Sequence, residues 1–392
     1  MTRPDTNREV LQRSIWTTIL PARLLINAQF RVPYPFLPAI SRGLGVPLEV
    51  ASLLLTVRGL LGAASPLFGY MADRYGRKLV MAAGLAMLVA GTGLLAAGRS
   101  FGLALAAFAL MGLAKSAYDP AMQAYVSDQV PYEKRGRALG LIELSWAASW
   151  LLAVPISGWL ITRWSWHAPF LAIAVLGMLS LAGTLQLKES AEFRRAAQEG
   201  EAYQVSFAVS VRPLLTPKPL LVLAACGLLI LANENFYVSY GAWMEGRFGL
   251  DPGGLGVVSV VVSLAELAAA LLSAGIVDRL GKERALIIGL AANMAAYLLL
   301  PRISGGVAGA MAGLLLLAAT SEFSIVSSLP LVSELAPSVR GTAMAAYAAV
   351  TAGAGLTVCM GSPGHQWGWA SLLFAAMLAL TNVFDKPHSG NQ

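Results

Sequence analysis

The chain has 392 residues, of which 57% are hydrophobic and only 12% are charged. Soluble domains carry about a quarter charged residues, so this composition excludes an ordinary soluble enzyme and predicts a membrane protein. The net charge of +7 is explained by Lys and Arg in cytoplasmic loops, and we expect no nucleic-acid partner.

Apolar runs, cut at charges, Pro and Gly, predict an all-α membrane protein with twelve transmembrane helices, since a membrane helix needs ~20 apolar residues. The longest polar connection, a cytoplasmic loop of residues 188–218, separates an N-terminal six-helix bundle, 1–187, from a C-terminal six-helix bundle, 219–392. The predicted spans are 14–38, 49–71, 78–98, 101–127, 137–161, 167–187, 219–243, 253–277, 284–302, 305–333, 341–360 and 367–384.

The basic residues predict how these spans are oriented. With the N-terminus inside, the inner segments hold 19 Lys and Arg residues and the outer loops hold 5. Cytoplasmic loops are rich in Lys and Arg, so both termini are expected in the cytoplasm. We see no removable signal peptide and expect a multi-pass protein of the plasma (inner) membrane. It would lie among membrane lipids as a monomer, unless it is part of a larger complex.

A charged motif recurs between the spans. The segment GYMADRYGRK, residues 69–78, places four charges in six positions, and its Asp-Arg pair at 73 recurs at 278 in GIVDRLGKER, 205 residues later. The Arg-Gly pairs of PYEKRGRA and PSVRGTA show the same offset. Two landmarks at one offset predict two halves of the same design. We expect Gly76 and Gly281 to permit a sharp loop in each half.

These motifs resemble the major facilitator superfamily. GYMADRYGRK fits its signature Gly-x-x-x-Asp-Arg-x-Gly-Arg-Arg/Lys between helices 2 and 3, and DQVPYEKRGRA is similar to its segment after helix 4. The resemblance implies two bundles with alternating access between them. It also implies a cytoplasmic charge network that stabilises the outward-open state. The candidate gate residues are Asp73, Arg74, Gly76, Arg77, Asp128, Arg135, Asp278, Arg279 and Arg340.

Several ionisable residues lie inside predicted spans, where they are costly and usually face a cavity or a partner. Arg23, Asn27 and Arg31 recur every four residues on one face of the first span, and Tyr34 returns to that face. Arg58 lies about 13 Å into the second span. These guanidiniums suit a carboxylate or phosphate on a substrate. Alternatively, acidic residues of the same half neutralise them.

Those acidic residues are in the fourth and fifth spans. Asp119 follows Lys115 by one helical turn, and a structural ion pair and a transport role are equally open readings. Glu143, Trp146 and Trp150 share one face of the fifth span. The two Trp side chains either stack on a ligand or fill space between helices. Asp119 and Glu143 are the acids that could neutralise the three arginines.

The membrane charges of the second half are all acidic. Glu234, Glu266 and Glu322 each lie near the middle of a span. Glu234 is flanked by Asn233 and Asn235, which we expect to loosen the helix around a site. Carboxylates inside a membrane protein can carry a proton at physiological pH, which suits proton coupling.

The predicted function is therefore secondary active transport, proton-coupled, of a small organic solute with an anionic or zwitterionic group. The alternatives are a lipid or amphiphile flippase and a non-transporting assembly or pigment-handling subunit. We expect no enzymatic activity, cofactor or metal site, and the sequence has no Walker A motif. Substrate-binding candidates are Arg23, Asn27, Arg31, Tyr34, Arg58, Trp146, Trp150 and Glu234, and proton-coupling candidates are Asp119, Glu143, Glu234, Glu266 and Glu322.

Overall fold

The computed structural model describes residues 15–129, 142, 145–189, 212–334, 346–347 and 350. The chain divides into two compact units, Met1–Gln204 and Val205–Gln392. The division falls inside the polar connection, 188–218, that the sequence places between two halves. Every regular element in the described residues is a helix, which confirms the predicted all-helical class.

The first predicted span begins as a π-helical turn, η1 (Ile15–Ile19), which runs into α2 (Leu20–Arg31). A turn at Val32 separates α2 from α3 (Pro33–Leu44), because prolines cannot donate the backbone hydrogen bonds that a continuous helix needs. Gly45, with φ 66°, ends α3. The helical segment therefore extends beyond the predicted end at residue 38.

The second span is bent. It consists of α4 (Leu48–Gly62) and α5 (Ser65–Tyr75), and the two helix axes differ by 42°. The rest of the first unit follows in chain order as helices. They are α6 (Arg77–Ala97), α7 (Phe101–Gln129), η2 (Ser149–Ala153), α9 (Val154–Arg163) and α10 (Ala168–Gln186).

The charged segment 69–78 is mostly helical, which corrects the prediction of a loop. Helix α5 runs through Tyr75, and α6 begins at Arg77. Gly76 alone stands between them, with φ 107°, a backbone conformation that L side chains rarely adopt. The predicted role of glycine at this turn is confirmed, and its counterpart Gly281 has φ 81°.

The second unit is also built of long helices. After a short 3₁₀ turn, η3 (Arg212–Leu215), its four described membrane helices are α13 (Pro217–Phe248), α14 (Pro252–Leu280), α15 (Lys282–Ile303) and α16 (Val307–Glu334). The predicted spans 341–360 and 367–384 lie outside the described residues, apart from 346–347 and 350. Within the described residues, eight helices are long and apolar enough to cross a membrane, and the bent pair α4–α5 makes a ninth.

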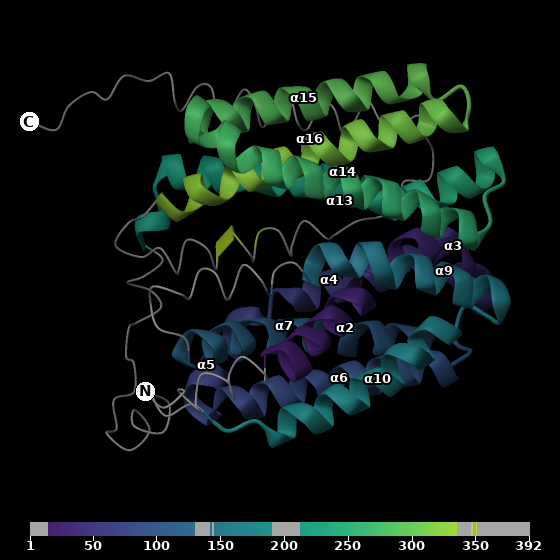
Figure 1. The fold of residues 1–392 in the computed structure, drawn as a ribbon, viewed down its shortest axis with the longest axis vertical. Coiled ribbons are helices and arrows are strands. Elements are labelled where there is room, and N and C mark those ends of the chain that lie inside the picture. The colour runs from purple at the N-terminus through teal and green to yellow at the C-terminus, as the bar shows by residue number, and fades with distance from the viewer. Residues whose placement is uncertain are drawn as a thin grey trace, which may run out of the picture. The chain divides into compact units, whose positions relative to one another are not determined.

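The helices of each unit pack side by side. In the first unit, α6 packs against α7 and α10, and α7 also packs against α4 (Figure 1). In the second unit, α16 packs against α15 and α14. Large apolar side chains such as Leu179 and Leu271 remain exposed, as expected for surfaces that face lipid tails.

The contact between α4 and α7 gives a testable prediction. A Cβ atom at Gly112 would lie 2.5 Å from the backbone oxygen of Arg58. Gly112→Ala should therefore push α4 and α7 apart and lower stability by about 1–3 kcal/mol, measured as a lower melting temperature in detergent. The control is Gly93→Ala on α6, where a Cβ would meet nothing within 4 Å. Equal melting temperatures for the two variants would contradict this packing.

Candidate functional site

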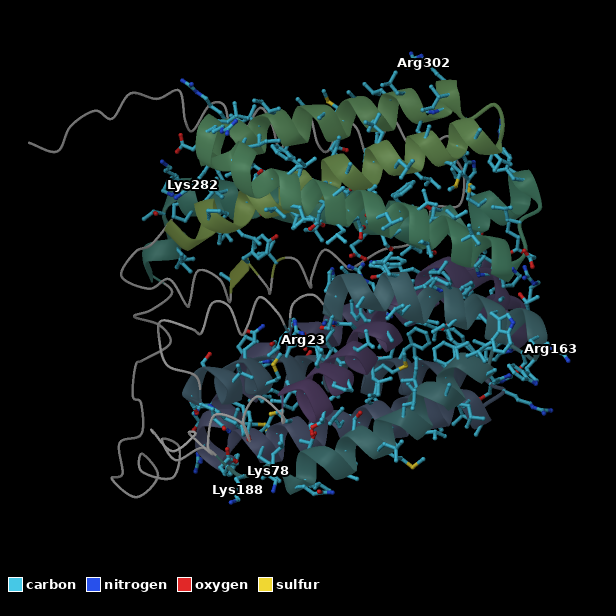
Figure 2. All side chains as sticks on the ribbon, viewed as in Figure 1. Arg23, Lys78, Arg163, Lys188, Lys282 and Arg302 are labelled. Carbon is cyan, nitrogen blue, oxygen red and sulfur yellow. The ribbon has the colours of Figure 1, made fainter. Side chains whose placement is uncertain are left out.

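Arg23, on α2, lies between the two ends of the first unit. Figure 2 shows Lys78 and Lys188 near one end of this unit and Arg163 near the other, with Arg23 between them. In a membrane-spanning bundle, this position is inside the span. Charged groups at such depth need partners or a ligand.

Arg23 already has a partner. Its Nη1 donates to Oδ1 of Asp119 on α7 at 3.1 Å. Lys115, one turn earlier on α7, donates from Nζ to Oδ2 of the same carboxylate at 2.8 Å and to Oδ1 of Asn27 at 2.9 Å. Asn27 in turn donates to the Ser145 hydroxyl at 3.2 Å. The structure thus brings both helices together through one carboxylate, and we interpret Arg23 and Asn27 as parts of this network.

Arg58 is also committed to internal contacts. Only 1% of the residue is exposed, and its Nη1 donates to the backbone oxygen of Phe30 at 2.7 Å. Its guanidinium carbon lies 3.9 Å from the centre of the Phe30 ring and 5.1 Å from that of Tyr34. A cation on these aromatic faces is stabilised by their quadrupoles. This geometry favours a structural role for Arg58, joining α4 to the end of α2.

Arg31 differs from the other two arginines. Its guanidinium carbon lies 3.6 Å from the centre of the Trp146 ring and 4.7 Å from that of Trp150. Only 6% of the residue is exposed, and its buried Nε has no hydrogen-bond partner. Among the described residues, no carboxylate lies within ion-pair distance of this guanidinium. Arg31 is therefore a buried cation with two ring contacts, an unpartnered Nε and no described carboxylate beside it.

An aromatic cluster surrounds Arg31, and the sequence reasoning missed one of its members. The Phe30 ring centre lies 6.1 Å from that of Tyr34 and 6.3 Å from that of Trp146. Phe30 and Trp146 are half-buried, whereas Tyr34 and Trp150 are buried. Phe30 could have been found because it follows Asn27 by three residues and so shares the polar face of the helix. The side chain of Glu143, which was a candidate here, lies outside the described residues.

Polar contacts join α6, α7 and the segment after α10 at the end of the unit where Lys78 and Lys188 lie. Figure 2 shows the position of these two lysines. Arg77 forms an ion pair with Asp128 at the end of α7. The backbone N–H of Lys78 donates to the Glu189 carboxylate at 3.1 Å, and the Tyr125 hydroxyl donates to the backbone oxygen of Lys188 at 2.9 Å. Glu189 was not predicted, although an acid at a helix N-terminus is a common stabilising contact.

The structure describes fewer contacts for the other gate candidates. Arg74 is exposed and donates to the Tyr70 hydroxyl at 3.0 Å, and Arg279 is exposed at the end of α14. The side chains of four candidates lie outside the described residues, and these are Asp73, Arg135, Asp278 and Arg340.

The Arg77–Asp128 contact leads to a second prediction. If this ion pair holds the α6 and α7 ends together in one conformation, Asp128→Asn should slow transport several-fold while membrane insertion is unchanged. The measurement is initial uptake rate at equal protein amounts in proteoliposomes. Arg77→Lys keeps the charge and should lose less activity than Asp128→Asn. Full activity in Asp128→Asn would contradict the role in gating.

The three acids of the second unit lie on three different helices. Glu234 is on α13, Glu266 on α14 and Glu322 on α16, and each is half-buried. The Tyr237 hydroxyl donates to Oε1 of Glu266 at 2.5 Å. A short hydrogen bond from a phenol to a carboxylate fixes the orientation of that carboxylate. Glu266 is thus the acid for which the described contacts define the geometry best.

A neutral polar network in the second unit corrects the prediction that asparagines loosen α13. Helix α13 runs unbroken from Pro217 to Phe248. Asn233 donates to the backbone oxygen of Leu229 at 2.8 Å and to Oδ1 of Asn293 at 3.2 Å. Asn293 donates to the Thr320 hydroxyl at 3.0 Å. These amides bind neighbouring helices together, because buried polar groups are stable only when they have partners.

Comparisons with known proteins assign the chain to a family. The sequence profile of the Major Facilitator Superfamily matches residues 19–358. The uncharacterized MFS-type transporter YwfA of Bacillus subtilis (strain 168) is 25% identical over 365 residues, covering 90% of this chain and 86% of that protein. The tetracycline resistance protein, class C, of Escherichia coli is 27% identical over 274 residues and covers 68% of each chain.

Solved structures share the fold at low sequence identity. A D-xylose-proton symporter has a TM-score of 0.75 and 17% identity, with 94% of this chain and 96% of that chain covered. The peptide transporter POT in complex with sulfate has a TM-score of 0.71 and 16% identity, with 95% of this chain and 94% of that chain covered. At these identities the likeness establishes the architecture and leaves the substrate to be argued from the residues.

Proposed function

Because this chain belongs to the major facilitator superfamily, we propose that it is a proton-coupled secondary active transporter for a small organic solute with an anionic or zwitterionic group. Membership of the family makes it a multi-pass membrane transporter rather than an enzyme. Alternating access between the two bundles would carry the solute across the membrane.

The choice of an anionic or zwitterionic solute rests on the buried Arg31, which has no ion-pair partner among the described residues. A guanidinium inside a membrane protein is costly unless it is paired, and Asp119 pairs with Arg23 and Lys115 but not with Arg31. An anionic group on the solute would supply the missing partner. A cationic solute would be repelled by the Arg31 charge, and a neutral one would leave that charge uncompensated.

Proton coupling rests on the acids of the second unit. Glu266 is held by Tyr237 in a half-buried position on a membrane helix. A carboxylate there can exchange a proton with water when the site opens to one side, and carry it when the site is closed. The D-xylose-proton symporter that shares the fold is proton-coupled by its name. The assignment of protons to this chain is our proposal.

The proposed setting is the plasma membrane, with both termini in the cytoplasm and the protein acting as a monomer. The support is the excess of basic residues in the inner segments. In the first unit, Lys78 and Lys188 would lie at the cytoplasmic end and Arg163 at the outer end (Figure 2).

The test is uptake into proteoliposomes of labelled hydrophilic anions, zwitterions, neutral sugars and cations, with and without an inward proton gradient. We expect accumulation of a solute with an anionic or zwitterionic group, larger when the gradient is present, and its loss in Arg31→Gln. The matched control is Arg163→Gln, which removes an exposed arginine at the far end of the unit. Accumulation of cations alone, or uptake insensitive to the gradient, would overturn the proposal.

The two alternative functions give different results in the same vesicles. A flippase would move labelled lipid between the leaflets and no hydrophilic solute. An assembly subunit would move neither and would co-purify with other proteins at fixed stoichiometry.

A further inference from the structure

We propose that the solute is a carboxylate attached to a flat aromatic body, with its carboxylate on Arg31 and its ring against Phe30 and Trp146. This inference rests on the proposed function and narrows its substrate class. It follows from the unpartnered Nε of Arg31 and from the half-buried aromatic side chains near it.

The position that the protein leaves open is the Nε of the guanidinium. Trp146 and Trp150 lie against Arg31, with ring centres 3.6 and 4.7 Å from its guanidinium carbon, and π-faces accept no conventional hydrogen bond of carboxylate strength. The N–H groups of a guanidinium lie in its plane and form a fork that matches the two oxygens of a carboxylate. The buried Nε of Arg31, which has no hydrogen-bond partner, belongs to this fork. A ligand that satisfies it must therefore bring hydrogen-bond acceptors to the edge.

The charge around Arg31 suits one carboxylate rather than a more highly charged group. Both oxygens of Asp119 are engaged, one by Arg23 and the other by Lys115. Arg58 donates to a backbone oxygen and stacks on Phe30. Among the described residues of this cluster, Arg31 is the cation for which the structure gives no hydrogen bond or ion pair to another described residue. One open fork accepts one two-oxygen anion.

The aromatic side chains beside Arg31 suit a flat ring. Tyr34 and Trp150 are buried, but Phe30 and Trp146 are only half-buried, with Lys115 Nζ 5.6 and 4.9 Å from their ring centres. Their ring centres are 6.3 Å apart, with an angle of 39° between the planes. Aromatic rings attract one another in offset and edge-to-face arrangements at such separations. A ring carried by the solute would find these half-buried rings next to its carboxylate site, whereas a short aliphatic acid would leave them uncovered.

The experiment is isothermal titration calorimetry of the full-length protein in detergent with matched pairs of probes. The acids are benzoate, cinnamate and indole-3-carboxylate, each compared with its primary amide, and acetate tests the carboxylate without a ring. Binding is preferable to uptake here because undissociated aromatic acids cross lipid bilayers unaided. We expect at least one aromatic acid to bind, with its amide and acetate each at least about tenfold weaker.

Variants separate the two contacts. Arg31→Gln should weaken the aromatic acid by about 10- to 150-fold, the range expected for a charge-assisted hydrogen bond. Phe30→Leu should weaken binding of the aromatic acid several-fold. The ratio of the Kd of the amide to the Kd of the acid should stay unchanged. Arg163→Gln is the control for a lost exposed arginine. If Arg31→Gln does not fold, the ranking of acid, amide and acetate on the unchanged protein still decides the proposal.

The contradicting results are distinct from those for the proposed function. Equal binding of acetate and the aromatic acids would overturn the ring contact, and equal binding of acids and amides would overturn the Arg31 contact. Failure of all three aromatic acids to bind, while a non-aromatic anion is transported, would overturn this inference and leave the proposed function standing. If an aromatic acid binds but no solute is transported in response to a proton gradient, the proposed function would be overturned and the aromatic carboxylate site would stand.

Discussion

Asp119→Ala is expected to destabilise the first unit by about 3–5 kcal/mol, because it leaves two buried or half-buried cations without their shared carboxylate. Arg23 and Lys115 lie 3.1 and 2.8 Å from the two Asp119 oxygens. The Arg23 side chain is only 4% exposed and that of Lys115 20% exposed, so most of this charge would lack both a partner and full hydration. The measurement is thermal or denaturant unfolding in detergent, together with the amount of protein that inserts into the membrane.

The control for Asp119→Ala removes the cations as well. A triple variant with Arg23→Met, Lys115→Met and Asp119→Leu has no buried charge in this network, and apolar replacements of buried ion pairs are often neutral or stabilising. We expect it to recover most of the lost stability. Its preference for an acid over the matching amide should then persist if Arg31 is the anion site, whereas total affinity will change with the loss of Lys115, whose Nζ lies 4.9 Å from the Trp146 ring centre. Unchanged stability in Asp119→Ala, with transport abolished, would instead make Asp119 part of the transport chemistry.

Glu266→Gln is expected to abolish proton-driven accumulation while exchange of solute across the membrane continues. The variant keeps the size of the side chain and cannot carry a charge. With one proton moved per solute, a pH difference of one unit supports about tenfold accumulation, since one pH unit corresponds to about 1.36 kcal/mol. In Glu266→Gln the solute should therefore only equilibrate. The measurement is the ratio of internal to external labelled solute at steady state, alongside counterflow at equal pH.

The matched controls for Glu266 are the other two acids. Glu234→Gln and Glu322→Gln also remove a half-buried carboxylate from a membrane helix, whereas the hydrogen bond from the Tyr237 hydroxyl goes to Glu266. They should retain more gradient-driven accumulation than Glu266→Gln. Tyr237→Phe removes the donor and should shift the pH profile of uptake without abolishing accumulation. Loss of accumulation in Glu234→Gln or Glu322→Gln, with Glu266→Gln unaffected, would assign the proton to another acid.

The local features of the fold could be read from the chain. Long apolar runs must form helices in a membrane, because lipid cannot hydrogen-bond an exposed backbone. The position of the turn at Gly76 was predicted from the glycine in the charged motif, and its φ of 107° suits glycine. The length of the turn was not predicted, because α5 keeps its backbone hydrogen bonds through the charged residues up to Tyr75. Helical spacing also placed Arg23, Asn27 and Arg31 on one side of α2.

The partners of those residues were decided by the tertiary structure. Spacing along the chain offered Arg23, Arg31 and Arg58 equally to a substrate or to Asp119, and only the packing of α7 brought Asp119 to Arg23. The same packing placed Arg58 against Phe30 and Arg31 against the indoles of Trp146 and Trp150. The physical reason is that a helical repeat fixes which face a side chain occupies. The axial position and rotation of the neighbouring helix, set by the packing of many side chains at once, determine what that face meets.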